Sequence, residues 1–242
     1  MIQLKNLCKK YVEDKYAVDH LDLEIKDGEI FGFLGPNGAG KSTTLKMMTG
    51  ITNITEGSIV INGYDISKEP LMTKKQFAFV PDSPDMFLRL KGIEYLHFMA
   101  DIYGVDLDTR KERIENFTKR LGMEDALNNQ IQSYSHGMRQ KIILIGALIH
   151  NPDVWILDEP LTGLDPKSAF ELKEMMHEHV RQNKTVLFST HVLDVAEKIC
   201  DRVGIIDHGK LLFVGTIDEM QKHFSNNKSL EEMFLELTND DE

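Results

Sequence analysis

An eight-residue segment near the start of the chain has the residue types and spacing of a phosphate-binding loop. Two glycines separated by four residues are followed by lysine and a hydroxyl residue. The glycines let consecutive backbone N–H groups surround phosphate oxygens, Lys41 can reach the β- and γ-phosphates, and Ser42 can offer its oxygen to Mg²⁺. The expected nucleotide-binding residues are Gly35, Pro36, Asn37, Gly38, Ala39, Gly40, Lys41, Ser42 and Thr43.

The sequence around the loop supplies the context that this pattern requires. The apolar run Ile30–Leu34 before it predicts a buried strand, and Thr43–Thr49 after it has helical character, with Gly50 placed to end the helix. The N-terminus of such a helix carries partial positive charge, which favours a bound phosphate. The alternative is a glycine-rich turn that binds nothing. We expect the chain to bind a nucleoside triphosphate.

A second group of candidate residues stands at the end of another apolar run. Val154–Leu157 leads directly into Asp158 and Glu159, so both carboxylates are expected at the carboxyl end of a buried strand, the edge where open α/β sheets bind ligands. Asp158 would hold Mg²⁺ directly or through water, and Glu159 would polarise the water that attacks the γ-phosphate. The alternative is two strand-end acids that face solvent, which the phosphate-loop pattern disfavours.

The composition fits one large α/β domain or a core with a smaller inserted lobe. The chain has 242 residues, 41% of them hydrophobic, and a net charge of −11. Because nucleic acid is held by a surplus of Lys and Arg, no nucleic-acid partner is expected. No apolar run approaches the roughly 18 residues that span a bilayer, and the N-terminus lacks a signal-peptide profile.

The two cysteines give a further indication of the compartment. Cys8 and Cys200 lack the spacing of a metal site. As reduced thiols they suit a cytosolic protein, and a disulfide between them stays open as the alternative.

The elements that must position the candidate residues follow from periodicity and turn signals such as Asp27-Gly28 and Asn62-Gly63. Strands are predicted first at Ile2–Leu4, Leu21–Ile25, Ile30–Leu34, Ser58–Ile61 and Gln76–Val80, and again at Val154–Leu157, Thr185–Ser189 and Val203–Asp207. Helices are predicted at Tyr95–Tyr103, Thr109–Leu121, Gly137–His150, Lys167–Gln182 and Val192–Ile199. The alternation predicts βαβ crossovers and a mainly parallel sheet, interrupted by a helical lobe.

This order predicts a single domain with distinct parts. The α/β core and a β subdomain occupy 1–84 and 150–215, a helical lobe is inserted at 85–149, and a helical tail covers 216–242. Asp207-His208-Gly209-Lys210 predicts a hairpin turn, with Leu211–Val214 as its return strand. The last residues, Asn239-Asp240-Asp241-Glu242, predict a solvated acidic tail.

With these motifs in order, the chain resembles the nucleotide-binding subunit of an ATP-binding cassette (ABC) transporter over essentially its whole length. Ser133–Gln140 stands at the place of the family's signature sequence, Thr162–Asp165 matches its D-loop, and Ser189-Thr190-His191 matches its switch histidine. Tyr11 stands where the family has an aromatic residue that stacks on adenine. The resemblance implies an α/β phosphate-loop NTPase with a mainly parallel core sheet, an antiparallel N-terminal β subdomain and an inserted α-helical lobe.

Two places depart from the family's pattern. The signature is usually Leu-Ser-Gly-Gly-Gln, and here it reads Tyr-Ser-His-Gly-Met, so Ser135 and Gly137 match whereas His136 and Met138 do not. Where the family has a glutamine after a strand, this chain has Asp82. A carboxylate can still ligate Mg²⁺, although it donates no hydrogen bond when ionised. A helix-capping or turn aspartate is the alternative for Asp82.

The resemblance also implies a mechanism. Two cassettes, identical or similar, would pair head to tail around two ATP–Mg²⁺, each site joining Lys41 and Ser42 of one chain to Ser135 and Gly137 of the other. Glu159 would activate water, His191 would contact the γ-phosphate, and Asp165 would link the two sites. His136 could add a donor near the phosphate or simply face solvent. Closing and opening of the pair would drive a membrane subunit between conformations.

The partner implied by the resemblance is a separate integral membrane permease, which would place this chain on the cytoplasmic face of the cell membrane. The signature variant, Asp82 and the ending Ser229–Phe234 resemble the ABC-2-type exporter branch, which favours export. The alternatives are a soluble ABC-superfamily ATPase that acts on ribosomes or nucleic acid, and a regulatory ATPase not coupled to transport. A single cassette, without long coiled coils, disfavours the first of these.

Other residues are expected to serve the fold or the surface. His177 and His179 lie two positions apart on a predicted helix, face different directions and make a poor metal pair, so both are expected at the surface. Trp155, Met47, Met48, Met86 and Met99 are expected in the core, although those of the methionines near Asp82 could instead line a groove for a partner helix.

Overall fold

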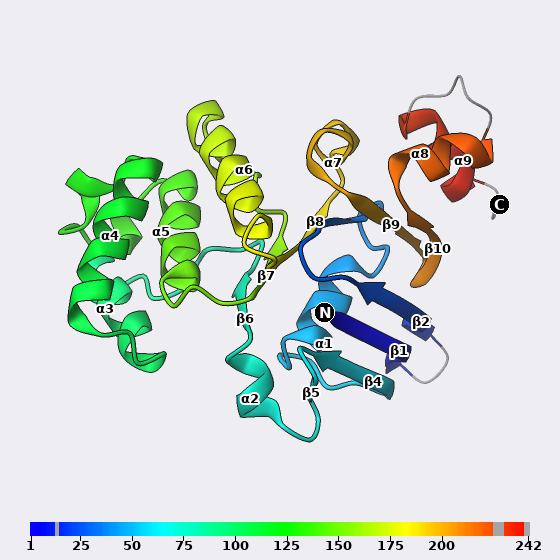
Figure 1. Ribbon diagram of the computed structural model, residues 1–242, viewed down its shortest axis with the longest axis horizontal. Coiled ribbons are helices and arrows are strands. Elements are labelled where there is room, and N and C mark those ends of the chain that lie inside the picture. Colours follow the sequence, from blue (N-terminus) through cyan, green and yellow to red (C-terminus); the bar gives the residue numbers. More distant parts are fainter. Residues whose placement is uncertain (13–14, 225–229, 240–242) are drawn as a thin grey trace.

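The computed structural model describes residues 1–12, 15–224 and 230–239 and contains two β-sheets and a group of helices (Figure 1). The strands are β1 (Ile2–Val12), β2 (Lys15–Ile25), β3 (Ile30–Leu34), β4 (Glu56–Ile61), β5 (Tyr64–Asp65), β6 (Phe77–Val80), β7 (Val154–Asp158), β8 (Thr185–Thr190), β9 (Arg202–Asp207) and β10 (Lys210–Gly215). The helices are α1 (Lys41–Met48), α2 (Pro70–Lys74), α3 (Gly92–Ile102), α4 (Leu107–Leu121), α5 (His136–Leu148), α6 (Pro166–Val180), α7 (Leu193–Ile199), α8 (Ile217–Phe224) and α9 (Leu230–Asn239).

The larger sheet has six strands in the order β10-β9-β3-β8-β7-β6. All its neighbours are parallel except the hairpin β9–β10. The carboxyl ends of β3, β8 and β7 therefore lie side by side, with Leu34 paired to Thr190 and Asp158 paired to Ser189. This register places the start of the phosphate-binding loop and the strand-end acids at one edge of the sheet, as the sequence predicts.

The smaller sheet has four strands in the order β2-β1-β4-β5, and every pair in it is antiparallel. It lies beside α1 at the end of the molecule opposite α3 and α4 (Figure 1). The predicted fold class is confirmed: a mainly parallel core sheet, an antiparallel N-terminal sheet and a group of helices between β6 and β7.

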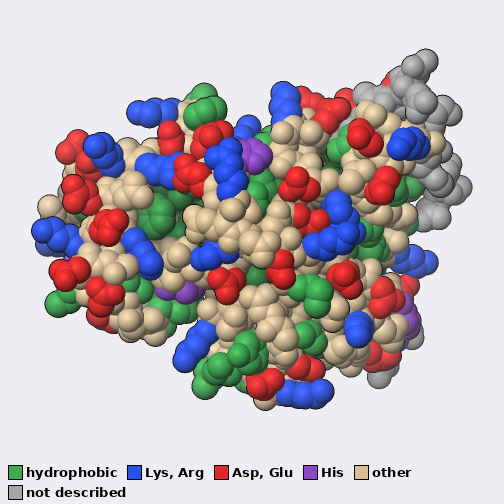
Figure 2. Space-filling model, in the orientation of Figure 1, with side chains coloured by type: hydrophobic (Ala, Val, Ile, Leu, Met, Phe, Trp, Pro, Cys, Tyr) green, Lys and Arg blue, Asp and Glu red, His purple; other side chains and the backbone are tan. Residues whose placement is uncertain are grey.

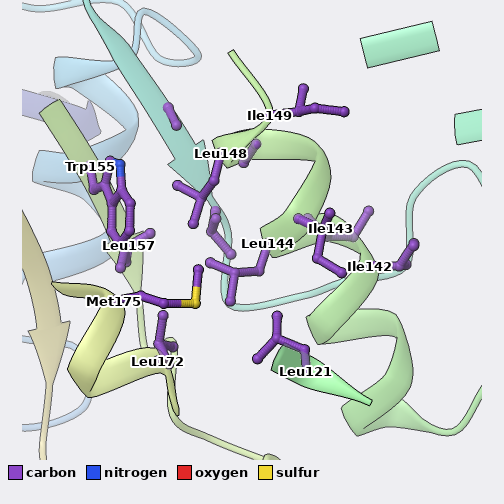
Figure 3. Packing of buried hydrophobic residues seen from close by; sticks show 14 of the residues in the cluster. Leu121, Ile142, Ile143, Leu144, Leu148, Ile149, Trp155, Leu157, Leu172 and Met175 are labelled. Carbon is purple, nitrogen blue, oxygen red and sulfur yellow. The ribbon is translucent and has the colours of Figure 1, made fainter. Parts of the chain in front are cut away.

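Helices α5 and α6 cover one face of the larger sheet. Leu144 and Leu148 of α5 point toward Trp155 and Leu157 of β7, and Met175 of α6 closes the same cluster (Figure 3). These side chains are almost entirely buried, and full burial of one large apolar side chain contributes about 1.5–3 kcal/mol. The contact holds the C-terminal half of α5 against β7.

The opposite face of the larger sheet is covered by α1 and the smaller sheet. Ile156 and Leu187 point to this side, where they join Leu45 and Met48 of α1 in a second buried cluster. Side chains of a strand alternate between faces, so β7 sends Trp155 one way and Ile156 the other. Because both faces are covered, β3, β7 and β8 read as continuous apolar runs in the sequence.

Some elements differ from the sequence-based predictions. Strands β1 and β2 have 11 residues each, far beyond the predicted Ile2–Leu4 and Leu21–Ile25, and helix α2 was not predicted. The surface prediction is wrong for His179, which is 3% exposed because its ring stacks on Trp155 at 4.2 Å. Most of the predicted acidic tail lies outside the described residues.

Among the residues that the structure describes, none of the helices combines the length and the apolar character needed to cross a bilayer.

Candidate functional site

The phosphate-binding loop connects β3 to α1 and needs glycine at two positions for steric reasons. Gly40 caps α1 with φ +111°, a backbone conformation that side chains disfavour. A Cβ there would lie 2.6 Å from the carbonyl oxygen of Ala17, and a Cβ on Gly35 would lie 2.3 Å from that of Ile206. The loop is therefore wedged between β2 and β9, which fixes where the first N–H groups of α1 point.

Lys41 is buried at the base of this loop. Its Nζ donates hydrogen bonds to the carbonyl oxygens of Gly35 at 2.6 Å and Pro36 at 3.0 Å. Burial lowers the pKa of Lys41, while the carboxylates of Glu159 and Asp158 oppose that shift. An ammonium that is shielded from water and held only by neutral carbonyls would bind an anion more strongly than it binds those carbonyls.

A cavity of about 200 Å³ opens above the loop. It is lined by Ala17, Asn37, Gly38, Ala39, Gly40, Lys41, Ser42, Thr43, Asp82 and Glu159. The predicted loop residues thus meet two acids from other parts of the chain. Gly35 and Pro36 lie beneath, where their carbonyls hold Lys41. Backbone N–H groups, an ammonium, a hydroxyl and carboxylates around one cavity suit a polyphosphate with a divalent cation.

The strand-end acids form a hydrogen-bonded network with the end of β8. The Ser189 hydroxyl donates to Asp158 Oδ1 at 2.5 Å and accepts from the backbone N–H of Glu159 at 3.1 Å. Asp158 is 2% exposed and therefore sits below the cavity, whereas Glu159 reaches its wall. His191 Nδ1 lies 2.9 Å from Glu159 Oε1. Glu159 has φ +47°, which turns the chain sharply after β7.

Of two other predicted site residues, Asp82 lines the cavity and Tyr11 does not. Asp82 follows β6, is exposed and lines the cavity; α3, the next helix, is capped at Lys91, so Asp82 does not cap a helix. Tyr11 lies on β1 and is 61% exposed, with Lys9 Nζ 5.0 Å from its ring centroid. Tyr11 therefore does not line the cavity, and its exposed ring is accessible to another group.

The signature residues open helix α5, as predicted. Ser135 is the N-cap, and its hydroxyl accepts a hydrogen bond from the Met138 N–H at 3.3 Å. A Cβ on Gly137 would lie 2.5 Å from the Gly163 carbonyl oxygen, and the His136 ring packs against Gly163. The signature segment therefore contacts the D-loop of its own chain and lies away from the residues that line the cavity.

Asp165 ends the D-loop and caps α6. Its carboxylate accepts hydrogen bonds from the backbone N–H of Ser168 at 3.0 Å and from the Ser168 hydroxyl at 2.7 Å. Lys141 of α5 donates to the same carboxylate at 2.6 Å. The hydrogen bond from Lys141, followed by those from Ser168, holds the pKa of Asp165 well below its usual range.

Sequence reasoning missed three residues of this region. Ser189 was noted only as part of the switch motif, although its position at the end of β8 beside β7 could have identified it as a partner of Asp158. Lys141 lies six residues after Ser135, and the helical repeat alone gives no reason to pair it with Asp165. Ala17 lines the cavity because its strand passes the loop, which no local pattern indicates.

Comparisons with known proteins give a consistent answer. The ABC transporter family model matches residues 18–162. The ABC transporter ATP-binding protein NatA of Bacillus subtilis is 34% identical over 91% of each chain. The daunorubicin/doxorubicin resistance ATP-binding protein DrrA of Streptomyces peucetius is 33% identical over 93% of this chain and 68% of its own. A solved ATP-binding subunit of an ABC transporter is 32% identical with a TM-score of 0.93, covering 98% of this chain and 99% of that chain.

Proposed function

Because this chain belongs to the ABC transporter family and is an ATPase, we propose that it is the subunit that powers a separate membrane permease. It would act at the cytoplasmic face of the cell membrane and use ATP with Mg²⁺. We further propose the division made from the sequence: a core with a β subdomain at 1–84 and 150–215, a helical signature lobe at 85–149, and a C-terminal helical tail at 216–242.

The observation that carries this proposal is the cavity in which the phosphate-binding loop meets Glu159. The loop N–H groups and Lys41 would hold the β- and γ-phosphates. To do so, the Lys41 ammonium would leave the carbonyls of Gly35 and Pro36. Glu159, which reaches the wall of the cavity, would orient or deprotonate the attacking water, and His191 would hold Glu159 and contact the γ-phosphate.

The oxygen donors around the cavity fit Mg²⁺, which prefers carboxylates, hydroxyls and water. Ser42 and Asp82 line the cavity and would bind the ion. Asp158 lies below them and would act through a water molecule, with its carboxylate held by Ser189. The ion would neutralise charge that develops on the phosphate oxygens during transfer.

The position of the signature supports a site completed by a second cassette, either identical or similar. The N-terminus of α5, formed by Ser135, His136, Gly137 and Met138 and capped by the Ser135 hydroxyl, would face a nucleotide bound in the partner and present its remaining N–H groups to it. Tyr11, exposed on β1, would stack on adenine. ATP would hold the two cassettes together, and loss of the γ-phosphate would release them.

A groove between the core and the helices supports docking of a permease. Its lining includes Phe79, Met86, Phe87 and Met99, and two of these, Phe79 and Met86, lie within four positions of Asp82 in the sequence. Apolar side chains also gather over α2 (Figure 2), where Leu71 is 76% exposed. An apolar helix end of a membrane protein would bury these surfaces.

We propose that transport is outward, which the similarity to DrrA and the signature variant support.

The test combines two substitutions. Lys41→Ala should abolish ATP binding or hydrolysis. Glu159→Gln should keep ATP binding, lower hydrolysis by at least about 10²-fold, and trap an ATP-bound dimer on gel filtration with Mg²⁺. Glu124→Gln, an exposed glutamate on the helical lobe, is the matched control. A Glu159→Gln protein that stays monomeric with saturating ATP would contradict the two-cassette site.

A second experiment tests the partner. Purification from membranes in detergent should recover an integral membrane protein with the chain. Recovery of ribosomes or nucleic acid instead would favour the soluble alternative. Figure 2 shows acidic and basic side chains interspersed on one face of the molecule, which does not suit a nucleic-acid backbone.

A further inference from the structure

Three strands of the N-terminal sheet bring metal-ligating side chains to one place, away from the nucleotide cavity. Cys8 lies on β1, His20 on β2 and Glu56 on β4. One ligand atom from each, a sulfur, a ring nitrogen and a carboxylate oxygen, lies within 4.8 Å of the other two. Cys8 is fully buried whereas His20 and Glu56 are exposed, so the three ligand atoms are covered by protein on the Cys8 side and accessible to solvent on the other.

Irregular strand pairing creates this arrangement. Between the pairs Leu7–Leu21 and Lys9–Val18, Cys8 faces two residues of β2, and His20 has φ +47°. On the other side, the pairing of β1 with β4 shifts by one residue before Cys8 meets Glu56. A β-bulge redirects the side chains around it, and such bulges are frequent at functional sites. Two of them flank Cys8.

The surroundings of the trio suit a bound cation. Asp19 Oδ1 lies 2.6 Å from His20 Nδ1, and a carboxylate beside a ligating imidazole is the usual companion of metal-bound histidine. The backbone N–H of His20 donates to Cys8 Sγ at 3.3 Å and the sulfur lies 3.6 Å from the Asn6 carbonyl oxygen, so both contacts fix its position beside the other two ligands. A set of sulfur, nitrogen and oxygen donors suits zinc, whereas Mg²⁺ and Ca²⁺ prefer oxygen alone.

We propose that Cys8, His20 and Glu56 bind one zinc ion, with water in the fourth position. The ion would join β1, β2 and β4 across their bulges and so stiffen the sheet that carries Tyr11 and Ala17. This site is separate from the proposed magnesium site and does not depend on the proposed function. Sequence spacing gives no sign of it, because its three ligands come from strands that meet only in the folded chain.

The test uses the full chain without an affinity tag and without nucleotide. Zn²⁺ competed against a chromophoric chelator should bind with a stoichiometry of one per chain. Co²⁺ should give a tetrahedral visible spectrum together with a thiolate-to-metal charge-transfer band in the near ultraviolet. Zn²⁺ should also raise the thermal unfolding midpoint, since an ion that binds only the native state stabilises it.

Variants locate the ligands. His20→Gln and Glu56→Gln change exposed side chains, and each should weaken Zn²⁺ binding at least about tenfold; Asp19→Asn should weaken it by roughly 10–100-fold. Cys8→Ser should remove the charge-transfer band while circular dichroism checks its folding. Cys200→Ser and His208→Gln are matched controls and should bind like the parent. Equal affinity in the parent and in His20→Gln, or a band that depends on Cys200, overturns the proposal.

Discussion

Replacing Ser189 with alanine removes one hydroxyl that holds both strand-end acids in place. The hydroxyl donates to Asp158 at 2.5 Å and accepts from the Glu159 N–H at 3.1 Å, and Ser189 is fully buried. A hydrogen bond to a charged group contributes about 1.5–3 kcal/mol, and a neutral one about 1 kcal/mol. We therefore expect Ser189→Ala to lower the free energy of unfolding by about 2–4 kcal/mol. For a chain of this size, that corresponds to a fall of roughly 4–16 °C in the unfolding midpoint.

Thermal unfolding without nucleotide measures this loss. The control is Ser133→Ala, because the exposed Ser133 hydroxyl makes a single hydrogen bond to the Gln130 carbonyl, so its removal should change stability by less than about 0.5 kcal/mol. ATP hydrolysis should fall as well, since Glu159 loses the bond that positions its backbone. A double-mutant cycle with Asp158→Asn should give a coupling of about 0.5–3 kcal/mol. A midpoint within about 2 °C of the parent, or a coupling of zero, would refute the reasoning.

Three further substitutions test neighbouring contacts. Gly40→Ala puts a side chain 2.6 Å from a carbonyl oxygen at φ +111°, so calorimetry should show about 1–3 kcal/mol less stability and titration should show weaker ATP binding. Lys141→Met should cost less than about 1 kcal/mol, since its partner Asp165 is half exposed, but NMR titration should show the pKa of Asp165 rising toward its usual value. Burial lowers the pKa of His150 to about 4, so the unfolded chain binds more protons and stability falls as pH drops from about 6.5 to 4. His150→Phe, which keeps a ring against Tyr103, should flatten that part of the stability–pH curve measured by chemical unfolding.

The strands that carry the site could be predicted because they are buried on both faces. Ile30–Leu34 was predicted with the bounds that β3 has, and Val154–Leu157 misses β7 by one residue. Their apolar runs end where polar residues begin, and in a parallel sheet those ends share an edge. The meeting of the loop with Asp82 and Glu159 follows from that rule.

Contacts across strands and between helices could not be predicted in the same way. The second half of β1 and the first half of β2 carry lysines and other polar residues, with bulges in their pairing, so the alternation that marks a strand is lost. His179 was placed at the surface because helical spacing indicates direction but not what covers that direction. The gathering of Cys8, His20 and Glu56 depends on register, which one sequence does not reveal.

The packing of a single chain suggests how two nucleotide sites would communicate in the proposed pair. Gly137 of the signature is pressed against Gly163 of the D-loop, and Lys141 of the same helix is bonded to Asp165. The D-loop begins three residues after Glu159, and the Thr162 N–H donates a hydrogen bond to the Glu159 carbonyl. A nucleotide that draws the start of α5 toward the partner chain would therefore also pull on the segment that aims Glu159 in its own chain. Binding at one site would then bias hydrolysis at the other, because a tightly packed contact transmits a displacement rather than absorbing it.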